Sequence, residues 1–317
     1  MTEQISESSL LVDSQTDDST TQDPEPYEGA CDVFISGDSP VIASASAPAS
    51  SANLGPGFDC VALALSMRCT VELEAADDTV LMVDGEPNSP GTFLEKAVAP
   101  AGRPVHIAVN SPIPRARGLG SSAAVATAAA AAAFRLAEHE PTNRELFDLV
   151  AGLEGHCDNA AAAVYGGLVA VFDGNVLRLE LSDRLLPVVA VPGERLSTTR
   201  AREALPESID HAAAARSIAR AIFLVEGLRT ADASRLLAAS GDEMHELPRS
   251  ELSTVTTEAI SAARQAGALH AAWSGAGPSV IAFATAETVS DVVIAMESAV
   301  GPSGWARPLP ASQQGWA

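Results

Sequence analysis

Hydrophobic and polar positions along the chain follow two different periods. Between residues 61 and 73, apolar and polar side chains alternate in part, with the two-residue period of a strand. The apolar run at residues 185–192 is bounded by proline and predicts a strand that opens a second domain. Other short apolar runs predict strands at residues 41–48, 105–109, 168–172 and 280–284.

A helical period prevails elsewhere. At residues 211–240, apolar side chains such as Ile218, Ile222 and Val225 recur at helical spacing among charged ones. We expect this apolar set to face the core. Further helices are predicted at residues 121–138, from about 142 to 154, from 197 onwards and at 289–300.

The alanine-rich helix at 121–138 is preceded by a glycine loop, Pro114-Arg-Ala-Arg-Gly-Leu-Gly-Ser-Ser-Ala-Ala124. Its two glycines allow the backbone to approach an anion closely. Serine is a favoured N-cap, and a helix N-terminus carries free N–H groups with about half a unit of positive charge. The pattern predicts a phosphate-binding loop. It is not a Walker loop, because no Gly-Lys-Ser/Thr follows, and a capped packing helix is the alternative.

Length and charge narrow the class of protein. The 317 residues allow two domains, and the net charge of −22 argues against a nucleic acid partner. The only lysine is Lys96, and an acidic, lysine-poor surface resembles proteins of extreme halophiles, with ordinary surface acidity as the alternative. Residues 1–40 are acidic and contain no Lys or Arg, which predicts a disordered tail. With no signal peptide and no membrane span in the pattern, we expect a cytoplasmic protein.

Polar side chains in a Pro- and Gly-rich stretch, residues 47–59, form a first candidate site. We expect this stretch to be a loop. Asn53 offers a donor and an acceptor, and the Asp59 carboxylate can hold an ammonium group. Both residue types are also common in turns, so turn chemistry is the alternative.

Two further stretches carry candidate chemistry. Glu154, His156 and Asp158 are close enough in sequence to be metal ligands, an acid–base group or a helix cap, but too tightly spaced for a zinc cage. Arg202 follows a Ser-Thr helix start, and arginine suits a carboxylate ligand, although a solvated helix arginine is the simpler alternative.

Three ordered motifs together resemble those of the GHMP kinases, named for galactokinase, homoserine kinase, mevalonate kinase and phosphomevalonate kinase. They are the glycine loop, the Ala-Pro-Ala-Ser-Ser-Ala-Asn-Leu-Gly-Pro-Gly-Phe-Asp stretch at 47–59, and Ser-Gly-Ala-Gly-Pro-Ser at 274–279. The stretch at 47–59 is similar to homoserine kinases almost letter for letter. Glu154-Gly-His-Cys-Asp-Asn159 is similar to a Glu-Gly-His-Pro-Asp-Asn form of the same kinases, with Cys157 replacing Pro.

The resemblance covers roughly residues 41–300 and implies an α+β fold. After the tail at 1–40, it implies an N-terminal ATP-binding domain at 41–183, like the second domain of ribosomal protein S5. A ferredoxin-like C-terminal substrate domain would follow at 184–317. The segment at 84–104 is shorter than is usual in the family, and it leaves the adenine contacts unassigned.

The implied reaction is ATP-dependent phosphorylation of the L-homoserine hydroxyl to O-phospho-L-homoserine, a step toward threonine. The cofactors would be ATP and Mg²⁺, and a homodimer is compatible with the resemblance. The implied phosphate contacts are Pro114, Arg115, Ala116, Arg117, Gly118, Leu119, Gly120, Ser121, Ser122, Ala123 and Ala124. The implied homoserine contacts are Asn53, Asp59, His156, Thr198, Arg202, Arg249 and Gly275.

The resemblance also implies the catalytic centre. Ser122 and Glu154 would hold Mg²⁺, with Asp148 as the alternative to Glu154, because hard oxygen ligands suit this ion. Asn159 stands where related mevalonate kinases place an Asp as candidate base. No side chain then needs to take the hydroxyl proton directly, since phosphoryl transfer depends mostly on positioning and charge neutralisation.

Two other functions remain compatible with the sequence. A kinase of the same superfamily that acts on mevalonate, pantoate or shikimate would need no acid at Asp59 to bind an ammonium group. A non-catalytic protein of the same fold would bind nucleotide or metabolite without turnover. The intact glycine loop and Glu154 favour a kinase, since a binding protein need not keep the metal ligands.

Overall fold

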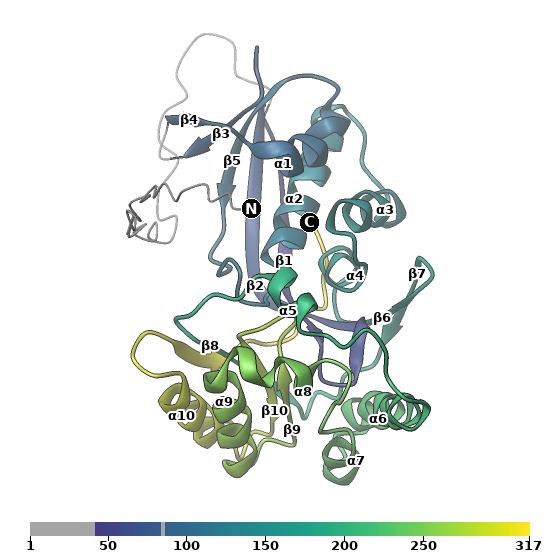
Figure 1. Cartoon of the computed structure of the whole chain (residues 1–317). Helices are drawn as coiled ribbons and strands as arrows, with labels where there is room; N and C mark the ends of the chain where they lie inside the picture. The colour runs from purple at the N-terminus through teal and green to yellow at the C-terminus, as the bar shows by residue number, and fades with distance from the viewer. Residues whose placement is uncertain (1–41, 84–85) are drawn as a thin grey trace, which may run out of the picture.

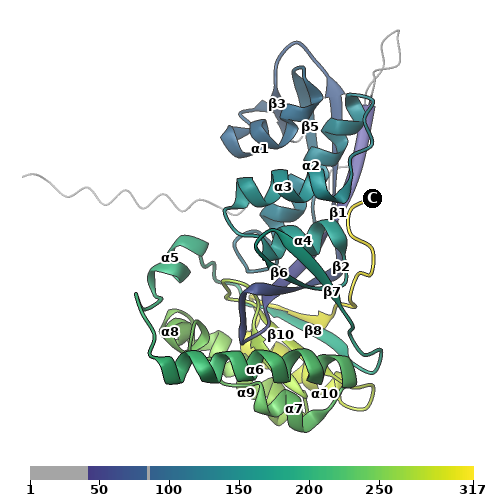
Figure 2. The same cartoon turned by 90° about the vertical axis from the view of Figure 1, so that its right-hand side faces the viewer.

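A computed structural model describes residues 42–83 and 86–317, and the predicted tail at 1–40 lies outside these residues. The chain forms two stacked domains (Figure 1). The first consists of a twisted sheet with helices on one face, and the second of a smaller sheet with its own helices. Figure 2 shows both domains from the side, with helix α5 (Thr198–Glu203) at the boundary between them.

The first sheet has the strand order β4-β3-β5-β2-β6-β7, and β1 pairs with β2 off this path. The helices α1 (Gly91–Val98), α2 (Ser121–Leu136), α3 (Asn143–Glu154) and α4 (Asp158–Tyr165) cover it. The strands are β1 (Ile42–Asn53), β2 (Gly57–Ala75), β3 (Val80–Val83), β4 (Glu86–Asn88), β5 (Val105–Asn110), β6 (Leu168–Phe172) and β7 (Asn175–Leu179). The strands predicted at 105–109 and 168–172 are confirmed.

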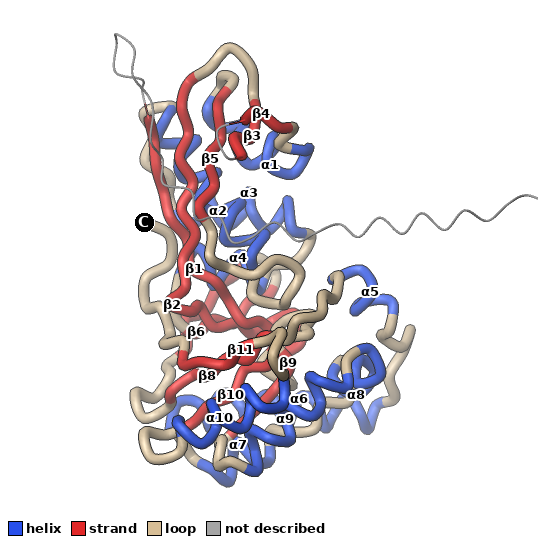
Figure 3. The backbone as a smooth tube through the Cα atoms, turned by 90° about the vertical axis from the view of Figure 1, so that its left-hand side faces the viewer, coloured by secondary structure: helices blue, strands red, loops and turns tan. Residues whose placement is uncertain are grey.

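Strands β1 and β2 form a long antiparallel hairpin, visible as the long red strands in Figure 3. The prediction of a loop at 47–59 was wrong, because only Leu54–Pro56 form a turn. Pro48 is accommodated inside β1 by an irregular register between Pro48 and Ala49. The tip of the hairpin reaches the second domain, where an isolated bridge joins Asn53 to Ser274.

Helix α2 lies against the hairpin, and its alanines are fully buried. Small side chains let the helix approach the sheet closely, which explains why a weakly hydrophobic sequence forms a core helix. The residue that caps α2 is Gly120, in the left-handed conformation with φ 62°, and no side chain caps the helix. The prediction of a serine N-cap was therefore wrong, since Ser121 already belongs to the helix.

The second domain contains an antiparallel sheet with the order β11-β8-β10-β9. Its strands are β8 (Leu186–Val191), β9 (His270–Trp273), β10 (Val280–Ala284) and β11 (Trp305–Pro308). Helices α9 (Thr254–Gln265) and α10 (Val289–Val300) pack on one face. This order confirms the ferredoxin-like arrangement, and the strands predicted at 185–192 and 280–284 and the helix predicted at 289–300 are confirmed.

Helix α6 (His211–Thr230) precedes α7 (Ala233–Ala238), α8 (Glu246–Arg249) and the short helix η2 (Ser250–Leu252). Two of the residues expected to face the core do not. Ile218 and Ile222 are each 64% exposed, whereas Leu224 and Leu228 are buried. Periodicity located the helix correctly but assigned the wrong face, because both faces carry apolar residues.

The end of the chain returns to the first domain. After β11, residues 309–317 run along the β1–β2 hairpin, where Ala317 and Ser46 exchange two backbone hydrogen bonds of 2.8 and 2.9 Å. Trp316 Nε1 donates to Asn143 Oδ1 of α3. The first domain is thus built from two separate parts of the chain. The predicted division, with residues 184–317 assigned wholly to the second domain, does not include this return. Within the described ranges, no helix is long and apolar enough to cross a membrane.

Candidate active site

A cavity of about 390 Å³ lies where the hairpin tip, the glycine loop and the second domain meet. Of the residues predicted to form the site, Ala123 and Ala124 are absent from its wall because both are buried inside α2, and the alternative metal ligand Asp148 is absent as well. The cavity brings together these predicted residues: Asn53, Asp59, Pro114 to Ser122, Glu154, His156, Asn159, Thr198, Arg202, Arg249 and Gly275.

The glycine loop packs directly on the loop at 274–279. At Gly118, with φ 73°, an added Cβ would lie 2.0 Å from the Ser274 carbonyl oxygen and 2.8 Å from the Gly277 nitrogen. Ser274 Oγ donates to the Gly118 carbonyl at 2.7 Å. At Gly120, a Cβ would lie 2.0 Å from Ser50 Oγ. At Gly118 the neighbouring atoms belong to the backbone and at Gly120 to side chains, and both residues have a positive φ, which favours glycine.

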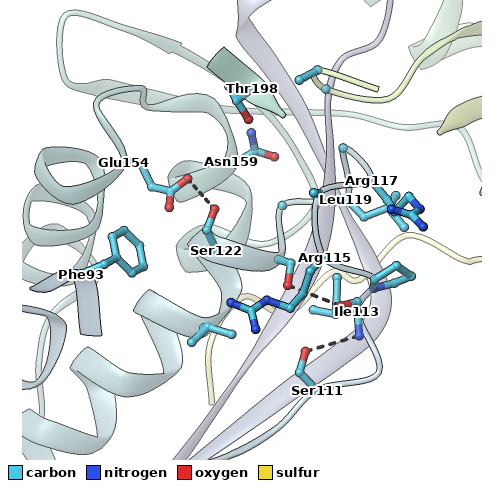
Figure 4. Close-up of a pocket in the computed structure, with 18 of the residues that line it drawn as sticks. Phe93, Ser111, Ile113, Arg115, Arg117, Leu119, Ser122, Glu154, Asn159 and Thr198 are labelled. Carbon is cyan, nitrogen blue, oxygen red and sulfur yellow. Dashed lines mark hydrogen bonds between the residues drawn. The ribbon is translucent and has the colours of Figure 1, made fainter. Parts of the chain in front are cut away.

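The N-terminus of α2 opens into the cavity with no side chain capping it. Its first N–H groups and the helix dipole therefore face the cavity, which suits an anion. Figure 4 shows Arg115 and Ser122 on this side, whereas the Arg117 side chain points away. Arg117 Nε and Nη2 donate to the carbonyls of Pro192 and Gly193, so its guanidinium links the glycine loop to the second domain.

Ser122 and Glu154 meet across the cavity, and Ser122 Oγ donates to Glu154 Oε2 at 3.0 Å (Figure 4). Burial raises the pKa of the Glu154 carboxyl, and the Ser122 hydrogen bond opposes this shift. Asp148, the alternative metal ligand, lies elsewhere: its carboxylate pairs with Arg144 Nε at 2.7 Å on an exposed part of α3. The geometry therefore favours Glu154 over Asp148 as the partner of Ser122.

His156 lies between two carboxylates. Its Nδ1 is 3.0 Å from Asp158 Oδ1, and its Nε2 is 3.5 Å from Glu154 Oε2. The hydrogen bond to Asp158 raises the pKa of His156 above its ordinary value. Asp158 also accepts from the Asn159 backbone N–H at 2.7 Å, so one buried carboxylate orients both neighbours.

Asn159 makes side-chain contacts through both ends of its amide. Its Oδ1 accepts from Ser50 Oγ at 2.8 Å, and its Nδ2 lies 3.3 Å from Asp158 Oδ1. The amide is thereby oriented by groups on β1 and α4. An amide cannot act as a base at neutral pH, and these contacts give it a fixed orientation toward the cavity.

Asp59 and Arg202 form a bidentate ion pair between the two domains. Arg202 Nη1 and Nη2 donate to the two carboxylate oxygens, each at 2.9 Å. Both side chains are about 40% exposed, at 40% for Arg202 and 39% for Asp59. Thr198 lies at the start of the same helix, α5, where the Ser197 side chain accepts from the Arg200 N–H and caps the helix.

Arg249 and Asn53 converge on the Gly275 carbonyl. Asn53 Nδ2 donates to it at 2.9 Å, and Arg249 Nη1 lies 3.3 Å from it. Arg249 is only 2% exposed, and burial lowers its pKa to about 10, so it remains a cation at neutral pH. Asn53 Oδ1 also accepts from the Asp59 N–H, which fixes the backbone that carries Asp59.

An apolar end of the cavity was not predicted. Phe93 and Leu94 reach it from α1, with Leu81 from β3 and Val125 from α2 (Figure 4 shows Phe93). The many Pro and Gly residues at 84–104 predict turns, and they conceal the helix that supplies this part of the cavity. The signal in the sequence was the short amphipathic run Thr92-Phe-Leu-Glu-Lys-Ala-Val98.

Comparison with known proteins gives the class first. A model of the N-terminal domain of GHMP kinases matches residues 91–167, and a model of their C-terminal domain matches residues 224–302. These two segments include the glycine loop, the Glu154–Asn159 segment and the 274–279 loop. The fold is that of a GHMP kinase, with its N-terminal and C-terminal domains.

Individual relatives narrow the class. The chain is 36% identical over 268 residues to a homoserine kinase of Thermus thermophilus, covering 81% of this chain and 92% of the relative. It is 36% identical over 288 residues to that of Streptomyces coelicolor, covering 84% and 91%. The crystal structure of a homoserine kinase from Cytophaga hutchinsonii superposes with a TM-score of 0.79 at 25% identity, covering 90% of this chain and 99% of that one. The chain belongs to the homoserine kinase family of the GHMP kinases.

Proposed function

We propose that this protein transfers the terminal phosphoryl group of ATP to the hydroxyl of L-homoserine, giving ADP and O-phospho-L-homoserine for threonine biosynthesis. One observation carries the proposal. An acid and an arginine, Asp59 and Arg202, face each other in the same cavity as the glycine loop. Such a pair is complementary to a ligand with both an ammonium and a carboxylate, and the loop is complementary to phosphates.

The lining of the cavity favours one orientation of ATP. Its phosphates would lie at the open N-terminus of α2, on the loop that Gly118 and Gly120 hold against the 274–279 loop and β1. Its adenine would occupy the apolar end beside Phe93 and Leu94, which supply the flat apolar contacts a purine ring favours.

The residues present fit a magnesium ion. Ser122 Oγ and Glu154 Oε2 are hard oxygen atoms only 3.0 Å apart, on the wall next to the open end of α2. Mg²⁺ is usually held by one or two protein oxygens together with substrate phosphates. The ion would neutralise charge on the phosphates. Glu154 must be ionised to bind it, which its raised pKa makes harder at low pH.

The acceptor would bind between the domains. Its ammonium would contact Asp59, and its carboxylate would contact Arg202 and Arg249, while Asn53, His156, Thr198 and Gly275 complete the surrounding wall. The hydrogen bond to Asp158 raises the pKa of His156, and the ring is held between the Asp158 and Glu154 carboxylates in the cavity wall. Asn159 has no basic atom, so it would orient the hydroxyl while the developing charge is neutralised nearby.

The test is an assay of ADP release from MgATP with homoserine, mevalonate, pantoate and shikimate offered separately, across a series of potassium chloride concentrations. Turnover with homoserine alone is expected. Turnover with another acceptor would reassign Asp59 and Arg202, whereas nucleotide binding without any turnover by a folded protein would favour a binding function. An activity maximum at molar salt is expected if the acidic composition reflects a halophilic, cytoplasmic origin.

We also propose that the protein is a homodimer that associates through α6. The exposed apolar residues Ile218, Ile222 and Phe223 lie on this helix, and residues 211–225 contain no Asp or Glu. In a chain with a net charge of −22, such a surface can face its own copy without acidic repulsion. Light scattering should give a dimer mass that Ile222→Glu halves. Leu237 of α7 is 69% exposed, and the control variant Leu237→Glu should leave the mass unchanged.

A further inference from the structure

His245 is a buried histidine that touches both domains and one of the arginines of the cavity. It is completely shielded from solvent and precedes helix α8. Its Nε2 lies 2.7 Å from the carbonyl oxygen of Gly55 in the hairpin turn, and its Nδ1 lies 3.0 Å from Arg249 Nη1. Its backbone N–H donates to Asp242 at 2.6 Å, which fixes its place at the start of the helix.

These contacts define which ring nitrogen carries the proton. An arginine can only donate, so Nδ1 of His245 must be the acceptor and carries no hydrogen. Nε2 then carries the hydrogen and donates to the Gly55 carbonyl. The ring is therefore neutral, and the absence of solvent around it agrees with that state.

The Arg249 guanidinium is held from several sides. Its Nε donates to the Ala201 carbonyl of α5 at 3.1 Å, and its Nη1 contacts His245 and the Gly275 carbonyl. Its Cζ lies 5.5 Å from the centre of the Phe58 ring, on which His245 also stacks at 5.1 Å. Among the described residues, Nη2 is the guanidinium nitrogen with no hydrogen-bond partner, and Arg249 lines the cavity.

We propose that His245 is a positioning residue for the acceptor site: it accepts from Arg249 and donates to the turn at Gly55, so that Arg249 presents Nη2 to the acceptor carboxylate while the turn that leads into β2 and Asp59 is held in place. The inference rests on the proposed function, because it concerns how that acceptor is bound. It assigns His245 an effect on acceptor affinity and none on the phosphoryl transfer step.

Two conservative variants separate the two contacts. In His245→Asn, the amide oxygen takes the place of Nδ1 and can still accept from Arg249, while the contact to Gly55 is lost. In His245→Gln, the amide nitrogen reaches the place of Nε2 and can still donate to Gly55, while the acceptor for Arg249 is lost. We expect His245→Gln to raise KM for homoserine about ten-fold, the usual effect of misaligning one charged hydrogen bond, and His245→Asn to raise it less than about three-fold. In both variants kcat and KM for MgATP should stay within about two-fold of the wild type.

A double-variant cycle tests whether the effect passes through Arg249. His245→Gln should add no further rise in KM when Arg249→Ala is already present, because the group it positions is gone. Equal effects of the Asn and Gln variants, or multiplicative effects of His245→Gln and Arg249→Ala, would overturn the proposal. A purely structural role would instead lower thermal stability and raise both KM values together.

A measurement on the unaltered protein covers the case of a variant that fails to fold. Nitrogen-15 spectra of histidine-labelled protein at pH 7 should show His245 as the neutral ring with its hydrogen on Nε2. A hydrogen on Nδ1, or a protonated ring, would overturn the proposal, because Nδ1 could not then accept from Arg249. Failure of the wild type to phosphorylate homoserine is a separate result that would overturn the proposed function. The His245 comparison would then be made with the carboxylate-bearing acceptor that is turned over.

Discussion

Arg202 and Asp59, 143 positions apart in sequence, bind each other through two parallel hydrogen bonds of 2.9 Å across the domain boundary. In the proposed function, each of the two side chains binds the opposite end of an amino acid. Binding would then exchange one ion pair inside the protein for two ion pairs with the ligand. A ligand with a carboxylate but no ammonium would leave Asp59 without a cation, which favours zwitterions over acids such as mevalonate.

Arg202→Ala should raise KM for homoserine by about ten- to a hundred-fold, because a bidentate contact to a carboxylate is lost. The melting temperature should change little, since a partly exposed ion pair contributes little to stability. Arg200→Ala, two positions away on α5, is the matched control and should leave KM unchanged. Unaltered kinetics of Arg202→Ala would exclude its role in acceptor binding.

Glu154→Gln should lower kcat by about a hundred-fold or more, since it removes an anionic oxygen beside Ser122 while keeping the size of the side chain. ATP should also raise the melting temperature of this variant by the same amount with and without Mg²⁺. Asp148→Asn changes the exposed ion pair with Arg144 instead and should be nearly neutral. A reversed result, with Asp148→Asn inactive, would identify Asp148 as the ligand.

Gly118→Ala should lower the free energy of unfolding by about 2–4 kcal/mol, since the methyl group meets backbone atoms of the 274–279 loop and φ is positive. Activity should fall as well, because the two loops must separate. Gly152→Ala on α3 is the control, since nothing lies within 4 Å of its added Cβ, and it should be neutral or stabilising. Chemical denaturation measures both variants.

Protonation of His270 should account for part of the dependence of stability on pH. Burial lowers its pKa to about 4 from an ordinary value of 6.5, while its Nε2 contacts the Leu54 carbonyl. Between these pH values His270 binds a proton in the unfolded chain but not in the folded chain. Stability therefore falls as pH falls from 6.5 to about 4. The loss from this residue is about 3 kcal/mol.

His270→Gln, which can keep the hydrogen bond to Leu54, should flatten the dependence of the free energy of unfolding on pH in this range. His211→Gln, at an exposed position on α6, is the control and should retain the wild-type slope. Denaturation curves at closely spaced pH values make the comparison. Parallel slopes for the wild type and His270→Gln would show that other groups control the acid limb.

Much of the phosphate site could be predicted because its signals are local. Gly118, Gly120 and Ser122 are neighbours in sequence, and the need for a glycine or a helix start is evident from the residue type itself. The contact between Asp59 and Arg202 is different. Either residue alone is typical of a turn or a solvated helix, and only the family resemblance brought them into one site.

Other features could not be predicted from a single sequence. Ile218 and Ile222 satisfy the period of a buried helix face, but the face that is buried depends on how α6 packs against α7 and the core. The apolar end of the cavity required α1, a short helix in a segment rich in proline and glycine. The return of residues 309–317 to β1 depends on contacts between the two ends of the described chain, which no local pattern encodes.

That return has a consequence for folding during synthesis. The hairpin of β1 and β2 leaves the ribosome early, but the segment that pairs with Ser46 and supplies Trp316 to α3 is made only after β11. The second domain, in contrast, is complete once β11 has been made. The part of the molecule translated first is therefore finished after the part translated second, and until then one edge of its hairpin is available to chaperones or to other nascent chains.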